Sequence, residues 1–246
     1  SNHGTEQLIP ATGDWANLEL VPRGGSLNAL IGLLPKLHAP CYFVRYRTSN
    51  GKTCLRLRLP RSEMMREETR AFINSLAWDG WVTAITEQQH RLEIERYGGE
   101  RAFDVFQGLF IAESAFISWL ASKKLLNSLA LDDRAFLLHR WVEISPIRIE
   151  NIQAQGRSNG IQKSRKAKVE IPDVFPEALA SYRDTIDHYF DLISNQMEAL
   201  CALPSDLHES WGVAAHLFCN RIGITPDEEQ VVWKALVKNA RRLERV

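Results

Sequence analysis

Four stretches in the first hundred residues have the alternation or composition of β-strands. They cover residues 15–21, 41–47, 53–59 and 81–86, and the strictest alternation is in the third, where leucines occupy every second position. Asn50-Gly51 lies between the second and third stretches, and this pair is a strong signal for a tight hairpin turn. The pattern therefore predicts an antiparallel sheet that includes one hairpin.

Two stretches between these strands have helical patterns. A short helix is expected over 26–37. An amphipathic helix is expected from Ser62 to the Asp79-Gly80 stop, with an apolar face made of Met65, Phe72, Ile73 and Leu76. Together with the strands, these helices predict an α+β layer.

Beyond residue 100 apolar positions recur every three or four residues, which predicts helices. The expected helices cover 102–123, 132–142, 182–200, 205–219 and the stretch from Pro226, where Thr225 and Glu228 form a capping box. The predicted fold class is therefore α+β, with an N-terminal antiparallel sheet and packed helices followed by a C-terminal helical bundle. We expect one compact domain over 8–246, divided into an α+β part (8–100) and a mainly helical part (101–246).

The stretch 151–168 is expected to be a mobile surface loop, because Gly156 and Gly160 discourage regular structure. Its five basic residues are Arg157, Lys163, Arg165, Lys166 and Lys168. A solvated connection is the favoured interpretation over a binding site for an acidic peptide.

Charge and cysteine content narrow the class of protein. The 246 residues contain 30 Lys plus Arg and 30 Asp plus Glu, so the broad cationic field of a nucleic-acid-binding protein is absent. The four cysteines form no CxxC pair and are expected to be reduced core thiols. No signal-peptide pattern or membrane span is predicted, which favours a cytoplasmic protein.

Two arginines on one strand form the first candidate site. In the third strand stretch Arg56 and Arg58 share one face while the leucines between them enter the core. Planar guanidinium groups suit carboxylates, so the pair could clamp an anion. A solvated sheet face with surface ion pairs is the commoner outcome for such a pattern.

Two further clusters carry titratable groups. In the run from Glu93 to Gly99, a strand would point Arg96 away from Glu93, whereas a turn would bring the two together. A structural ion pair is the favoured interpretation there. His216 lies one helical turn before Asn220, and a lone helical histidine usually has a structural role.

Several common site motifs are missing from the sequence. It contains no GxGxxG, GxxxxGK[ST], HExxH or GxSxG, so nucleotide-binding, zinc-protease and serine-hydrolase functions have no support. No cofactor and no metal ion are predicted.

Read in order, these motifs resemble the lantibiotic-dehydratase C-terminal family, also called the thiopeptide-type bacteriocin biosynthesis family. The matching segments are Tyr42 to Arg47, Leu55 to Arg58, Glu93 to Gly99, Glu113-Ser114 and His216 to Arg221. The family often has His where this chain has Cys54, and Tyr-x-Pro where it has His90-Arg91-Leu92. The resemblance covers nearly the whole chain.

The resemblance implies elimination of glutamate from glutamylated Ser or Thr in a ribosomal precursor peptide. It assigns Arg56 or Arg58, with Arg96, as clamps on the glutamyl group. Glu93 is their orienter or a proton-transfer group, and His216 is a general acid or base. The residue that removes the Cα proton is left open between Glu93 and His216.

The implied partners are a precursor peptide with its leader and a separate tRNA-dependent glutamylation enzyme. Direct nucleic-acid binding is not expected, and a homodimer is left open. Two other functions are weighed against elimination. One is a thiopeptide pyridine synthase, which joins two dehydroalanines and releases the leader, and the other is a noncatalytic module that binds the precursor peptide.

Overall fold

The computed structural model describes residues 15–24, 27–88, 93–149 and 168–245. Its sheet contains β1 (Trp15–Pro22), β2 (Tyr42–Arg47), β3 (Thr53–Pro60) and β4 (Val82–Glu87), in the order β2-β3-β1-β4, and every neighbouring pair is antiparallel. The predicted strands are therefore confirmed to within about one residue at each end.

The hairpin between β2 and β3 forms as its turn residues predict. The Thr48 amide donates to the Lys52 carbonyl at 2.8 Å, and Gly51 takes a φ of 81°, which L side chains rarely adopt. On β3, Leu55, Leu57 and Leu59 are fully buried, whereas Arg56 and Arg58 point to the opposite face and are half-buried.

The short helices of the α+β part are more broken than the pattern predicts. The helix expected over 26–37 is split into α1 (Leu27–Ile31) and the 3₁₀ helix η1 (Leu34–Leu37), in which Pro35 lacks the amide that a continuous helix needs. The helix expected from Ser62 is split into α2 (Arg61–Met64) and α3 (Glu67–Trp78). Met65 lies in the break and is 73% exposed, so its assignment to the core is wrong.

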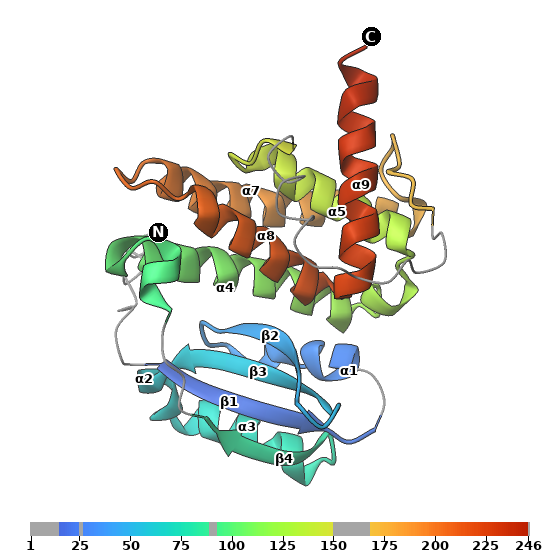
Figure 1. The fold of residues 1–246 in the computed structure, drawn as a ribbon. Coiled ribbons are helices and arrows are strands. Elements are labelled where there is room, and N and C mark those ends of the chain that lie inside the picture. The colour runs from blue at the N-terminus through green and yellow to red at the C-terminus, as the bar shows by residue number, and fades with distance from the viewer. Residues whose placement is uncertain (1–14, 25–26, 89–92, 150–167, 246) are drawn as a thin grey trace.

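The second half is a layer of helices on the side of the sheet that faces α4 (Figure 1). The layer contains η3 (Leu126–Ser128), η4 (Glu177–Tyr182) and the α-helices α4 (Glu100–Ser122), α5 (Leu131–Ile144), α7 (Arg183–Cys201), α8 (His208–Ile222) and α9 (Pro226–Leu243). Both α4 and α8 contact β2, and α4 also packs on α7. The α+β fold in one compact domain is confirmed.

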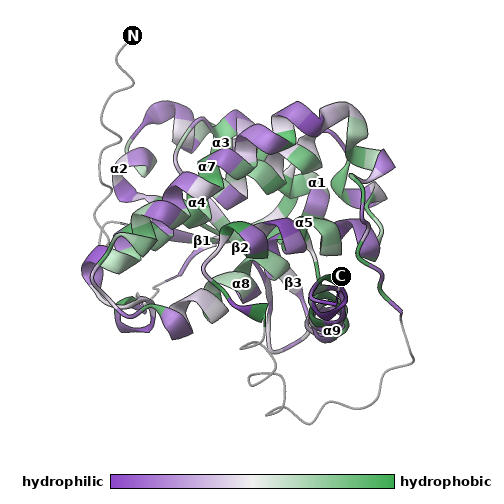
Figure 2. Cartoon of the chain, turned by 90° about the horizontal axis from the view of Figure 1, so that it is seen from above, coloured by the Kyte–Doolittle hydropathy of each residue, from purple (hydrophilic) through white to green (hydrophobic). Residues whose placement is uncertain are grey.

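The last helix runs across the others. Figure 1 shows α9 standing across α4 and α8, and Figure 2 views it along its axis. Its first turn carries the predicted capping box, because Glu228 N donates to Thr225 Oγ1 and Thr225 N donates to Glu228 Oε1. The cap fixes the helix start close to the end of α8.

One described helix, α4, is long and apolar enough by composition to cross a membrane. More than half of its most apolar window is buried inside the protein, including Phe106, Leu109 and Phe110. Its place between the sheet and the other helices accounts for its apolar character, as in the core helix of a globular domain.

Two sequence predictions meet the structure only in part. All four cysteines are free, but only Cys54 and Cys219 are buried, and Cys201 is exposed, so it is not a core thiol. The basic loop predicted over 151–168 lies outside the described residues except for Lys168, which pairs with Glu170 at 2.9 Å. The domain bounds 8–246 stay a prediction.

Candidate active site

The two strand arginines have different surroundings. Arg56 Nε lies 3.6 Å from Glu19 Oε2, and its guanidinium carbon lies 3.3 Å from the centre of the Tyr46 ring. Arg58 lies 5.7 Å from the Tyr42 ring centre and makes no ion pair within 4.0 Å with a described residue. Arg56 therefore forms the surface ion pair that the commoner interpretation predicts. The guanidinium group of Arg58 has no carboxylate partner among the described residues.

The Glu93 to Gly99 segment forms a turn. Its centre is the 3₁₀ helix η2 (Ile94–Tyr97), which brings Arg96 Nη1 to 3.0 Å from Glu93 Oε2. About half of each side chain is exposed. Gly98 ends the turn with a φ of 87°, a backbone conformation that L side chains rarely adopt, and a β-carbon there would lie 2.5 Å from Leu207 Cδ2. The turn alternative is confirmed and the strand alternative is wrong.

Tyr97 anchors this turn in the core. It is buried, and its ring packs against Phe103, Phe106 and Phe110 of α4. Burial raises the pKa of Tyr97 and the charge of Glu93 adds to this rise, while the charges of Arg221, Arg96 and Arg58 lower it.

The η2 turn is also tied to α8. The Ser210 hydroxyl donates to the Arg96 carbonyl at 3.0 Å. Arg96 and His216 line the same groove, which has a volume of about 2180 Å³ and runs along α8 and α9. Arg56, Arg58 and Glu93 are not among the residues that line it. Among the five predicted site residues, Glu93 and Arg96 are therefore in direct contact, and Arg96 and His216 line one groove.

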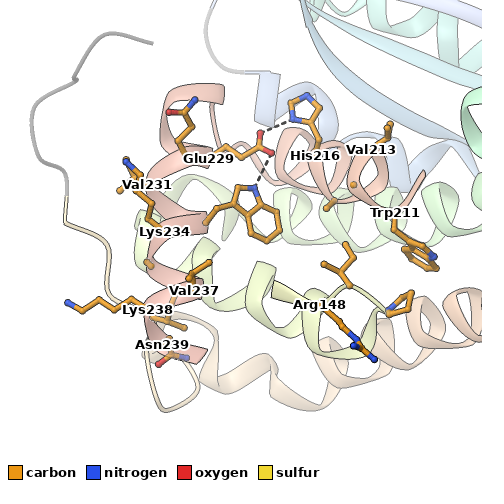
Figure 3. Close-up of a pocket in the computed structure, with 18 of the residues that line it drawn as sticks. Arg148, Trp211, Val213, His216, Glu229, Val231, Lys234, Val237, Lys238 and Asn239 are labelled. Carbon is orange, nitrogen blue, oxygen red and sulfur yellow. Dashed lines mark hydrogen bonds and ion pairs between the residues drawn. The ribbon is translucent and has the colours of Figure 1, made fainter. Parts of the chain in front are cut away.

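His216 is held by residues that the sequence interpretation did not include. Its Nδ1 lies 2.8 Å from Glu229 Oε2, and the Trp233 indole donates to Glu229 Oε1 at 3.3 Å (Figure 3). The hydrogen bond with Glu229 raises the pKa of His216, against opposing effects from burial and from Arg96. The imidazole therefore favours its protonated form more than an isolated histidine does.

A second group of residues, which the motifs contain but to which no role was given, joins the sheet to the helices. Asn220 accepts from the Arg45 amide at 2.8 Å and donates to the Arg45 carbonyl at 2.9 Å. Ser114 accepts from the Phe43 amide at 3.2 Å. These contacts satisfy backbone groups of β2, which is an edge strand, so α4 and α8 cover an edge that would otherwise be unpaired.

The centre of this junction is a buried ion pair. Arg221 Nη1 lies 2.8 Å from Glu113 Oε2, both side chains are fully buried, and Trp141 Nε1 donates to Glu113 Oε1 at 2.7 Å. Burial raises the pKa of Glu113 to about 7, while Arg221 and Trp141 act to lower it. Since no surface is exposed there, the pair has a structural role. The Glu-Ser and Asn-Arg motif pairs were the only signal of it in the sequence.

Metal binding has no site in the described part of the chain. Nowhere in residues 15–24, 27–88, 93–149 or 168–245 do three His, Cys, Asp or Glu side chains gather so that they could hold a metal ion. Among the residues that line the groove, His216 is of a type that can exchange a proton and Arg96 of a type that can bind an anion.

Comparisons with known proteins identify the fold and the family of the chain. No curated protein matches the sequence. Among solved structures, the tRNA-dependent lantibiotic dehydratase MibB from Microbispora sp. 107891 matches with a TM-score of 0.62 and 17% identity, covering 100% of this chain and 29% of that chain. The chain thus spans less than a third of MibB and shares its fold there. Residues 27–240 match the model of the lantibiotic biosynthesis dehydratase C-terminal family, and the chain belongs to that family.

Proposed function

We propose that this protein eliminates glutamate from glutamylated Ser or Thr of a ribosomally made precursor peptide, which leaves dehydroalanine or dehydrobutyrine. The observation that carries the proposal is that Arg96 and His216 line one groove. Membership of the dehydratase family supports it. The proposed enzyme is a lyase.

The reaction needs a base, a site for the developing negative charge and a site for the departing carboxylate. His216 lines the groove and is assigned proton transfer, because its ring is more than half exposed. Glu93 lies outside the groove lining with its carboxylate on Arg96, so it is assigned the role of orienting that arginine. Arg96 then binds the glutamyl carboxylate or the developing oxyanion.

The two strand arginines are assigned different roles. Arg58 lacks a carboxylate partner among the described residues, so it is the better candidate for a second clamp on the same anion. Arg56 already pairs with Glu19 and stacks on Tyr46, and its part is to fix the sheet face beside Arg58. The alternation along the strand suggested that Arg56 and Arg58 act as an equivalent pair, and we assign them separate roles instead.

The matches bear on the partners, because they include a solved structure that is described as a tRNA-dependent dehydratase. We propose that a separate tRNA-dependent enzyme glutamylates the precursor peptide, and that this protein acts on the product in the cytoplasm without binding nucleic acid itself. The zero net charge supports the last point.

A synthetic peptide tests the proposal. A leader-containing peptide with one glutamylated Ser is incubated with the purified protein, and mass spectrometry follows the release of free glutamate. Elimination gives a peptide with dehydroalanine in place of the ester. A second peptide with two dehydroalanines tests the alternatives, because cyclisation with leader loss identifies a pyridine synthase. Binding of either peptide without change identifies a noncatalytic module.

A further inference from the structure

Glu229 has no place in the predicted site, yet it makes the closest contact of His216. Its side chain is only 14% exposed, against 55% for His216. One carboxylate oxygen meets the imidazole at 2.8 Å, and the other accepts from the Trp233 indole at 3.3 Å. The carboxylate is therefore held at both oxygens, while the ring it holds stays open to the groove.

The start of α9 places this carboxylate. The capping box of Thr225 and Glu228 satisfies the first amides of the helix, so Glu229 is free to turn toward α8. Its position in the first turn also favours a negative charge, because the helix dipole is positive there. Figure 3 shows the Glu229 side chain directed at the His216 ring, with a dashed line for the contact between them.

We propose that Glu229 is a positioning residue that holds the His216 imidazole by Nδ1 and leaves Nε2 as the nitrogen that exchanges a proton with the peptide. This inference rests on the proposed elimination. A carboxylate accepts only, so neutral His216 must carry its proton on Nδ1, and the lone pair is then on Nε2. The same logic applies wherever a histidine is oriented by a carboxylate.

The proposed step couples removal of the Cα proton to loss of the glutamate ester. Nε2 takes the Cα proton of the glutamylated residue, the Cα–H electron pair forms the Cα=Cβ bond, and the Cβ–O bond breaks. Glutamate leaves with a carboxylate at the former ester, and the imidazolium that forms is stabilised by Glu229. Arg96 of η2 is the charged group that opposes this protonation, and Glu229 of α9 is the one that favours it.

Glu229→Gln tests the inference, because the amide keeps the shape and removes the charge. Two-dimensional ¹H–¹⁵N spectra of the His216 ring, recorded between pH 5 and 9, report its tautomer and its pKa without any substrate. We expect the pKa of His216 to fall in the variant, since the stabilising carboxylate is lost. In the pH profile of kcat/KM, the rise that reports deprotonation of His216 should move to lower pH by the same amount. The value of kcat should fall about tenfold or more.

Asp227→Asn is the matched control, because it removes one negative charge from the same helix turn at an exposed position. It should move neither the ring spectra nor the pH limb. Unchanged ring spectra in Glu229→Gln overturn the inference, as does a loss of activity explained by a lower melting temperature alone. If the wild-type protein eliminates no glutamate, the proposed function fails, while the ring spectra still decide whether Glu229 sets the tautomer.

Discussion

Two arginine–glutamate pairs from the family motifs have similar geometry and different surroundings. Glu113 and Arg221 meet at 2.8 Å at the junction of the sheet and the helices, where neither side chain is exposed. Glu93 and Arg96 meet at 3.0 Å at the edge of the groove, where about half of each is exposed. The two pairs therefore differ in burial. The buried pair joins the sheet to the helices, whereas the exposed pair leaves its arginine accessible to a substrate.

The energetic consequences of the two pairs should be opposite. An exposed pair contributes about 0–1 kcal/mol to stability, because water screens it. Removal of one partner of a buried pair leaves an uncompensated charge and costs about 3–5 kcal/mol. A variant of the exposed pair should therefore change activity, and a variant of the buried pair should change folding.

Arg221→Met should have the largest effect on folding. It leaves Glu113 buried without its guanidinium partner and removes the donor to the Phe43 carbonyl, so the free energy of unfolding should fall by about 3–5 kcal/mol. Urea unfolding monitored by tryptophan fluorescence measures it. Arg96→Met is the control and should cost less than about 1 kcal/mol.

The double variant Glu113→Leu with Arg221→Met tests the cause of that loss. It removes both charges together, so it should recover part of the stability that Arg221→Met alone loses. Equal losses in the single and double variants would mean that the contact with β2, and not the unpaired charge, dominates at this junction.

His216→Ala should have the largest effect on activity. Loss of the proton-transfer group should reduce elimination about 100-fold or more and cause glutamylated peptide to accumulate, while the free energy of unfolding changes by less than about 1 kcal/mol. Single-turnover mass spectrometry of the glutamylated peptide measures the rate. Normal turnover by this variant would exclude His216 from the mechanism.

Arg96→Gln should have a smaller effect on activity than His216→Ala. Loss of one charge-assisted hydrogen bond to the glutamyl group corresponds to about 1.5–3 kcal/mol, which is about tenfold to 100-fold in kcat/KM. Arg66→Gln is a matched control, because Arg66 is also an exposed arginine paired with a glutamate three residues away. Equal activity of both variants would place the anion site elsewhere, with Arg58 as the next candidate.

The sequence predicted the parts of this comparison that depend on local pattern. Alternation placed Arg56 and Arg58 opposite the buried leucines of β3, and the capping box marked the start of α9. The break of the first helix and the exposure of Met65 were missed, because strong helical periodicity concealed short irregular segments.

The contacts that define the site lie beyond such patterns. Glu113 and Arg221 are 108 residues apart, and His216 and Glu229 lie on different helices, so their pairing depends on how the helices cross. For the Glu93 to Gly99 run, periodicity could not decide between a strand and a turn, and the packing of Tyr97 on α4 selects the turn. Tertiary packing therefore decides which motif residues meet a substrate.

The smallest predicted effect is on the pH dependence of stability. The raised pKa of His216 means that its pairing with Glu229 stabilises the fold fully below the pKa of the unfolded histidine, about 6.5. That contribution is lost as pH rises through the higher pKa of the folded state. The difference in unfolding free energy between the wild type and Glu229→Gln should thus be larger at pH 6 than at pH 9, and urea unfolding at both pH values measures it. Because the His216 ring is more than half exposed, the change should stay below about 1 kcal/mol. A larger difference at pH 9 would show that Glu229 stabilises α9 through Trp233 and not through the imidazole.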